Sequence, residues 1–168
     1  MSVNNLMKNT LTKLTVPIFL LLFLSGCALS TAGSSVHSFC ERLNELDKSY
    51  EITESGFIAD SNTYSKFFVI DSNEILLKFT LDSKNRTKKM DIVYPIECNN
   101  SPASLEFIRN IIIAFCNNEK VSSEFLNFLE KEKVYSQTSF ETKETESDSI
   151  KLQVDATELG TIITVYAK

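Results

Sequence analysis

The fold is decided by residues 64–94, which read YSKFFVIDSNEILLKFTLDSKNRTKKMDIVY. Apolar residues alternate strictly with mostly polar ones at its centre: Ile75, Leu77, Phe79 and Leu81. A period of two predicts a strand with one buried face and one mostly solvated face. The flanking segments 71–73 and 83–86 are short and rich in turn-forming residues. Short connections of this kind predict an antiparallel meander.

The strand before this centre ends in Phe67-Phe68-Val69-Ile70, which is apolar on both faces. Either the strand is central and covered on both sides, or one face is left for a partner. We favour the covered strand, because one layer of helices together with loops could bury both faces.

Three segments have apolar residues at helical spacing. The expected helices are about three turns from Val36, capped by Ser34 or Ser35, then residues 102–117, then a short helix capped by Ser122 or Ser123. In the second helix Ser101 precedes Pro102, and proline is tolerated at the first helical position.

The remaining segments are strand-like and place the chain in the α+β class. Further strands are expected at 50–53 and 57–60 before the centre, and at 134–145, 150–156 and 161–167 after the helices. We therefore expect an antiparallel sheet of about six or seven strands with helices packed on one face, in the order α-β(4)-α-α-β(3). The similar spacing of Phe39, Leu43 and Tyr50 to Phe125, Leu129 and Tyr135 leaves a duplicated α-β-β-β unit open.

The N-terminal segment has the three parts of a secretory signal. Lys8 and Lys13 are its only charged residues, an apolar run covers residues 14–24, and small residues precede Cys27. The run has 11 residues, whereas a helix needs roughly 20 to span a bilayer. A cleaved signal is therefore favoured over a retained transmembrane helix.

The tetrapeptide Leu24-Ser25-Gly26-Cys27 resembles the lipobox of bacterial lipoproteins. The resemblance implies that diacylglycerol is transferred to the Cys27 sulfur, that the chain is cut before Cys27, and that at least two acyl chains hold it on a membrane. The expected organisation is a signal peptide at 1–26, a lipidated cysteine and flexible tether at 27–35, and one globular domain at 36–168. The protein would face the periplasm or the outside, on the cell membrane or the outer membrane. An ordinary signal peptide is the alternative.

The mature part is acidic, with 15 basic and 22 acidic residues remaining after residues 1–26 are removed, a formal charge of −7. Nucleic-acid partners need a basic face, so we expect none. The expected partners are the membrane, through the lipid on Cys27, and an unknown envelope protein or small ligand. No cofactor is expected.

Three cysteines, Cys40, Cys98 and Cys116, remain once Cys27 carries lipid. A helix over 102–117 would hold Cys116 too far from Cys98 for a disulfide. A bond from Cys40 to Cys116 or to Cys98 stays open, since export permits disulfides. The alternative is that all three are small buried apolar residues.

No catalytic or metal-binding motif stands out in the sequence. His37 is the only histidine and there is no CxxC pair, so no metal site is expected. His37 and Cys40 would be neighbours on one helix, but Cys40 lies on its apolar stripe, which favours packing over catalysis. The leading function is a non-catalytic binding module, which a flat, exposed apolar sheet face would support. The alternatives are an envelope hydrolase, which two close carboxyls in a cleft would support, and a structural envelope protein.

Overall fold

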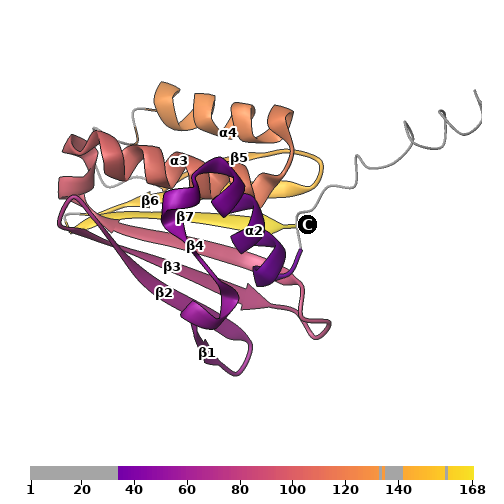
Figure 1. Cartoon of the computed structure of the whole chain (residues 1–168). Helices are drawn as coiled ribbons and strands as arrows, with labels where there is room; N and C mark the ends of the chain where they lie inside the picture. Colours follow the sequence, from indigo (N-terminus) through magenta and orange to yellow (C-terminus); the bar gives the residue numbers. More distant parts are fainter. Residues whose placement is uncertain (1–33, 133, 135–141, 158) are drawn as a thin grey trace, which may run out of the picture. The chain divides into compact units, whose positions relative to one another are not determined.

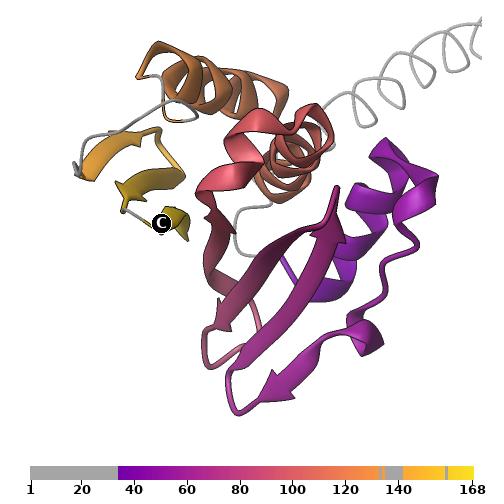
Figure 2. The same cartoon turned by 90° about the vertical axis from the view of Figure 1, so that its left-hand side faces the viewer.

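The computed structural model describes residues 34–132, 134, 142–157 and 159–168 of the chain. These residues form a seven-stranded antiparallel sheet with α-helices on one face only (Figures 1 and 2). The helices are α2 (Val36–Leu46), α3 (Pro102–Cys116) and α4 (Glu119–Lys131). The strands are β1 (Ile58–Asp60), β2 (Thr63–Ile70), β3 (Asn73–Leu81), β4 (Thr87–Pro95), β5 (Thr142–Glu146), β6 (Ile150–Ala156) and β7 (Gly160–Ala167). The predicted α+β class and its helices on one face are confirmed.

The strands lie in the order β1-β2-β3-β4-β7-β6-β5. Two meanders, β2-β3-β4 and β5-β6-β7, therefore meet where β4 pairs with β7 in antiparallel orientation. A helical segment precedes each meander, in agreement with the predicted element order. This arrangement accommodates a duplicated unit, which stays a prediction.

The turn between β2 and β3 consists of Asp71 and Ser72, whose φ angles are 49° and 65°. Positive φ at both central residues is typical of a type I′ turn, whose twist matches that of the flanking strands. Ile70 pairs with Asn73 across the turn. This pair sets the register of β2 on β3, and hence which side chains share a face.

Helices α3 and α4 are separated by a single sharp bend. Asn117 ends α3 in the left-handed conformation, with φ 42° and ψ 34°. The side chain of Asn118 then accepts a hydrogen bond from the Val121 N–H at 3.1 Å and caps α4. Helix α4 therefore begins at Glu119, a few residues before the predicted cap at Ser122 or Ser123.

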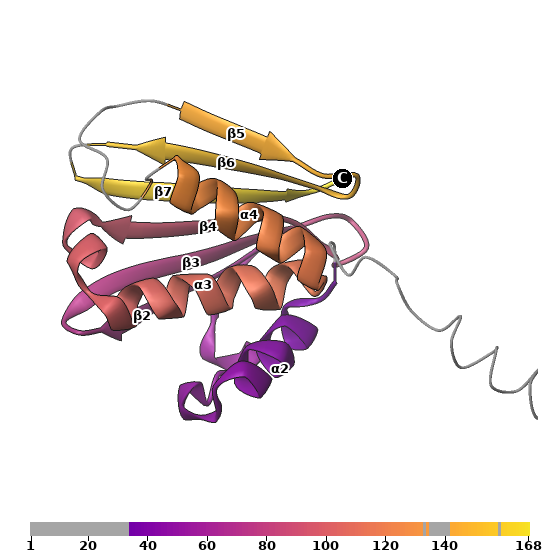
Figure 3. The same ribbon diagram turned by 90° about the horizontal axis from the view of Figure 1, so that it is seen from above.

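The core lies between the sheet and the helices. Seen from above, α3 lies between α4 and α2 across the sheet (Figure 3). Phe39 of α2 meets Phe79 of β3 edge to face, with ring centroids 4.9 Å apart, and Phe107 of α3 is equally buried. Burial of such large apolar side chains is the main favourable term in folding.

The segment expected as a strand at 50–53 is not one, and that prediction was wrong. Lys48–Tyr50 and Glu54–Gly56 form short 3₁₀ turns instead. The Asn44 side chain accepts a bond from the Ile52 N–H at 2.8 Å and donates one to its carbonyl at 2.7 Å. An amide side chain thus satisfies the backbone groups that a neighbouring strand would otherwise bind.

The three cysteines of the domain are free and buried, so the disulfide considered between Cys40 and Cys116 is not formed here. Removal from water raises the pKa of the Cys40 thiol to about 11 and that of Cys116 to about 12. Burial, with Glu97 nearby, also raises the pKa of Cys98, although a hydrogen bond with Ser104 opposes it. All three therefore behave as small apolar residues of the core.

Two serines hold the start of the described domain. Ser35 caps α2 by accepting a bond from the Ser38 N–H at 3.2 Å, and the Ser34 carbonyl accepts one from the Thr87 N–H at 3.0 Å. The predicted signal peptide, the lipobox with Cys27, and Tyr135 lie outside the described residues. Within the described part of the chain, no helix has the length and apolar character needed to cross a membrane.

Candidate functional site

The face of the sheet opposite the helices carries a continuous row of apolar side chains. Cross-strand pairs join Phe67 of β2 to Leu76 of β3, Leu76 to Val93 of β4, and Val93 to Ile162 of β7. Paired residues share a face, so these four form one line across four adjacent strands. We call this line the apolar row, and the face that bears it the open face.

Three further residues, Val69, Pro95 and Leu159, widen the row at one end of the strands. Phe67 is 61% exposed, Val69 67% and Leu159 86%, while the rest of the row is half-buried. A hollow of about 370 Å³ is lined by Leu159 and all four members of the row. We call these seven residues the apolar patch. Clustered exposed apolar residues of this kind mark interaction sites.

The other half of the open face is polar, and most of its charges are paired within the sheet, Lys78 being outside the ion pairs of the described residues. Lys89 Nζ lies 2.9 Å from Asp91 Oδ1, and the Thr164 hydroxyl donates to the same oxygen at 2.8 Å. Lys151 Nζ lies 2.8 Å from Glu144 Oε2. Because these charged groups already bond to one another, a partner would gain less by binding the polar half than by binding the apolar patch.

The favoured interpretation of Phe67–Ile70 as a strand covered on both sides is wrong. Phe68 packs against Phe107 of α3, with ring centroids 5.0 Å apart, and Ile70 also packs on the core. Phe67 and Val69 point to the other face, where no described helix lies. One face of the strand is instead exposed, as in the alternative interpretation, and a partner for that face stays a prediction.

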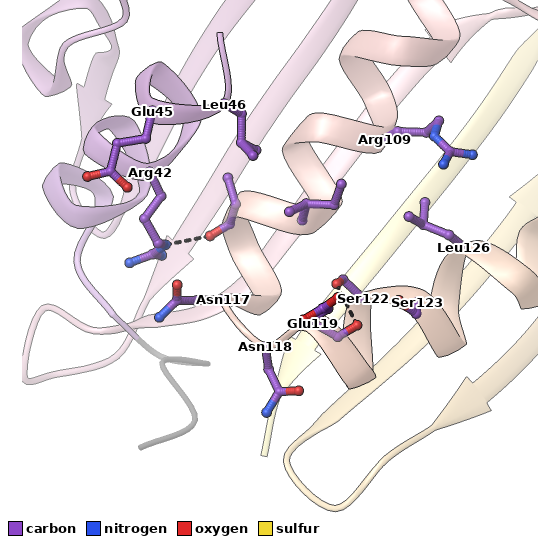
Figure 4. Close-up of a pocket in the computed structure, with 12 residues that line it drawn as sticks. Arg42, Glu45, Leu46, Arg109, Asn117, Asn118, Glu119, Ser122, Ser123 and Leu126 are labelled. Atoms are coloured by element: carbon purple, nitrogen blue, oxygen red, sulfur yellow. Dashed lines mark hydrogen bonds between the residues drawn. The ribbon is translucent and has the colours of Figure 1, made fainter. Parts of the chain in front are cut away.

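A second hollow of about 520 Å³ lies on the helix side, between α2 and α4 above α3 (Figure 4). Its arginines are engaged within the domain. Arg42 Nε donates to the Ala114 carbonyl at 2.6 Å, and burial lowers the pKa of this guanidinium. Arg109 Nη1 lies 2.9 Å from Glu130 Oε1. No pattern in the sequence predicted this groove, and its two arginines hold neighbouring helices together.

The described carboxyls with resolved shifts all have lowered pKa values. The backbone N–H and the guanidinium of Arg86 lower the pKa of Asp82 to about 2. The pKa is also lowered for Asp47, which accepts hydrogen bonds from Ser49, for Glu132, which accepts one from Lys143, and for Glu146, which accepts one from Lys168. A general acid needs a raised pKa, so these carboxyls do not support the hydrolase alternative.

The other candidate catalytic residues, His37 and Cys40, do not share a site. His37 Nε2 lies 3.3 Å from Glu41 Oε1 on an exposed helix surface, whereas Cys40 is buried. Among the residues that the structure describes, no group of three or more histidine, cysteine or acidic side chains could hold a metal ion. The acidic residues of strand β5 lie at the edge of the sheet, not in a cleft.

Comparisons with protein-family models, with curated proteins and with solved structures find no match to this chain. The candidate site therefore rests on its own geometry. The sequence analysis noted the apolar character of Phe67 and Val69, but it did not single out Val93 or Ile162. Each of those two residues is ordinary in its own strand, and only the pairing of β4 with β7 brings them into one row.

Proposed function

We propose that this protein is a lipid-anchored lipoprotein of the bacterial cell envelope that binds a protein partner through the apolar patch. The observation that supports binding is the apolar row itself, which crosses four strands on a face that no described helix covers. Covering this row with a partner would remove apolar surface from water, at about 25 cal/mol per Å².

The shape of the face favours a protein over a small ligand. The hollow in the apolar patch and a second one of about 370 Å³ in the polar half share Leu76, Val93 and Ile162. They are therefore parts of one broad surface. Small-molecule sites usually enclose most of the ligand, whereas a broad surface with an apolar centre suits a protein interface.

The anchor is inferred from the lipobox-like residues Leu24–Cys27, and the fold suits it. Ser34 is bonded to Thr87 at the start of β4, while Pro95 at the end of β4 belongs to the apolar patch. A nine-residue strand is roughly 26 Å long. The patch thus lies at the end of β4 away from Ser34, so an anchor joined through Ser34 would leave it accessible to a partner.

Anchoring is tested by membrane partitioning and intact-mass analysis of the wild type and a Cys27→Ala variant. We expect the wild type in the membrane fraction, starting at Cys27 and carrying acyl mass, and the variant without that mass. A soluble, unmodified wild type would overturn this part of the proposal.

Partner binding is tested with Leu76→Lys and its matched control Thr80→Lys, which lies on the same strand and the same face but in the polar half. Native electrophoresis of solubilised envelopes should show the wild type and Thr80→Lys in a complex, and Leu76→Lys outside it. Equal migration of all three forms would mean that the apolar row is not the contact.

A further inference from the structure

The edge of the sheet beside the apolar patch is only partly covered. Strand β2 has eight residues, and β1 pairs with Thr63, Tyr64 and Ser65 alone. On that side, residues 66–70 have no partner strand in the described parts of the chain. We call these five residues the open edge.

The register shows which backbone groups of the open edge point outwards. Ile70 and Asn73 close a two-residue turn, so they form a hydrogen-bonded pair. Hydrogen-bonded pairs alternate along an antiparallel ladder, so Phe68 and Lys66 also bond to β3. The N–H and C=O groups of Phe67 and Val69 therefore point away from β3. The pairing of Ser65 with Ile58 of β1 follows the same alternation.

The same two residues carry the exposed apolar side chains of β2, Phe67 at 61% and Val69 at 67%. Proteins normally protect a sheet edge with charges, proline or a bulge. The opposite edge follows this rule, because β5 reads TKETE and its Glu144 and Glu146 lie in ion pairs with lysines. The one charged residue of the open edge, Lys66, lies over the rings of Phe57 and Phe68 on the helix side, so the outward backbone groups at Phe67 and Val69 lie beside apolar side chains.

The charge next to the open edge indicates what would pair with it. Glu74 is the cross-strand partner of Val69 and is exposed. Within the described residues, no cationic group lies within ion-pair distance of its carboxylate. A strand added beside Val69 would lie two strand spacings, roughly 10 Å, from Glu74, within reach of a lysine or arginine side chain. The mature chain also carries a net charge of −7.

We propose that the open edge binds an extended segment of the protein partner as an added β-strand, with apolar residues at alternate positions beside Phe67 and Val69 and a basic residue near Glu74. Backbone bonds would hold the segment, and the alternate side chains would continue the apolar row over the open face. This inference rests on the proposed function, because it specifies how the partner reaches the apolar patch.

The decisive variant is Val69→Pro, with Val69→Thr as its matched control. Proline removes the outward N–H of Val69 but no bond to β3, and proline is tolerated at a sheet edge. Threonine keeps the backbone donor and the β-branched shape. Thermal unfolding of both variants close to that of the wild type would establish that the fold is intact.

The probe is a displayed library of short random peptides, selected on the protein purified in the form the cell makes. Enriched peptides should alternate apolar residues and include a basic one. They should bind Val69→Pro about tenfold more weakly than the wild type, and Val69→Thr nearly as well. N-methylation of the enriched peptides at alternate backbone nitrogens should abolish binding for one set of positions and spare it for the other.

Three results would overturn the inference: no enrichment of alternating peptides, equal binding to Val69→Pro and wild type, or a wild-type dimer that Val69→Pro converts to a monomer, which would assign the open edge to a second copy of this chain. These results are separable from failure of the proposed function. If Leu76→Lys disrupts the native complex while Val69→Pro leaves both that complex and peptide binding unchanged, the partner binds the apolar patch without adding a strand.

Discussion

The two faces of β3 differ in composition and in what covers them. Ile75, Leu77 and Phe79 face the helices and are fully buried, whereas Leu76, Lys78 and Thr80 alternate with them on the open face. The buried residues have a general role, because a core tolerates other apolar side chains of similar total volume at such positions. The open set has a pattern of its own, with its single apolar residue placed in the apolar row. The difference indicates that the helix-covered face stabilises the fold, whereas the open face contributes less to the core.

The largest expected effect comes from the helix-covered face. Phe79 packs against Phe39 and Phe57, with ring centroids 4.9 Å and 5.7 Å away. Phe79→Ala should lower the free energy of unfolding by about 3–5 kcal/mol, through lost burial and the cavity left behind. Urea unfolding followed by circular dichroism measures the change. A loss below about 1 kcal/mol would mean that this face does not hold the fold together.

The next largest effect on stability is expected at Asn44, whose side chain bonds to the backbone N–H and carbonyl of Ile52. Asn44→Ala leaves the N–H and the carbonyl of Ile52 without this partner and should cost about 1–3 kcal/mol. Asn44→Asp keeps the acceptor for the Ile52 N–H but sets a carboxylate oxygen against the Ile52 carbonyl, so at neutral pH it should also be less stable than the wild type. Equal stability of all three proteins in urea would show that the side chain does not organise this segment.

A smaller effect is expected at the turn between β3 and β4. Arg86 lowers the pKa of Asp82 from its ordinary value of 3.8 to about 2. A lowered pKa contributes stability above pH 4, and that contribution is lost as the pH falls from 3.8 towards 2. Asp82→Asn should therefore melt at a lower temperature than the wild type at pH 7, and at nearly the same temperature near pH 2. A difference between the two melting temperatures that is independent of pH would contradict this account.

The smallest effect on stability is expected on the open face. Leu76→Lys should change the free energy of unfolding by less than about 1 kcal/mol, because Leu76 is only half-buried and no described helix packs on it. Urea unfolding beside Phe79→Ala gives a direct comparison on one strand. If Leu76→Lys unfolded as readily as Phe79→Ala, the open face would be part of the core.

The sequence predicted the elements that depend on local patterns. Strict alternation at 75–81 predicted β3, and Ser101-Pro102 with Asn117 predicted both ends of α3. The strand predicted at 50–53 was wrong because the backbone of Ile52 bonds to the Asn44 side chain. No alternation of apolar residues indicates such a bond. The predicted start of α4 was late, because the side chain that caps this helix is Asn118, before the serines at 122 and 123.

The candidate site was harder to predict than the fold. The alternation in β3 placed Leu76 on the solvated face, and Phe67 and Val69 were noted as apolar on a strand with two apolar faces. Which of those faces is covered depends on where three helices pack. The line from Leu76 to Ile162 depends on β4 pairing with β7, a contact between residues about 70 positions apart in the chain. Neither fact is a local property of the sequence.

The most direct test of the binding proposal compares the two sides of the sheet in intact cells. A photo-reactive amino acid is placed at Leu76 on the open face in one form of the protein, and at Ser123, an exposed residue in the groove between α2 and α4, in another. After illumination, the proposal predicts one discrete cross-linked product from position 76, which Ile162→Lys removes, and none from position 123. A discrete product from position 123 alone would contradict it and would assign binding to the helix side.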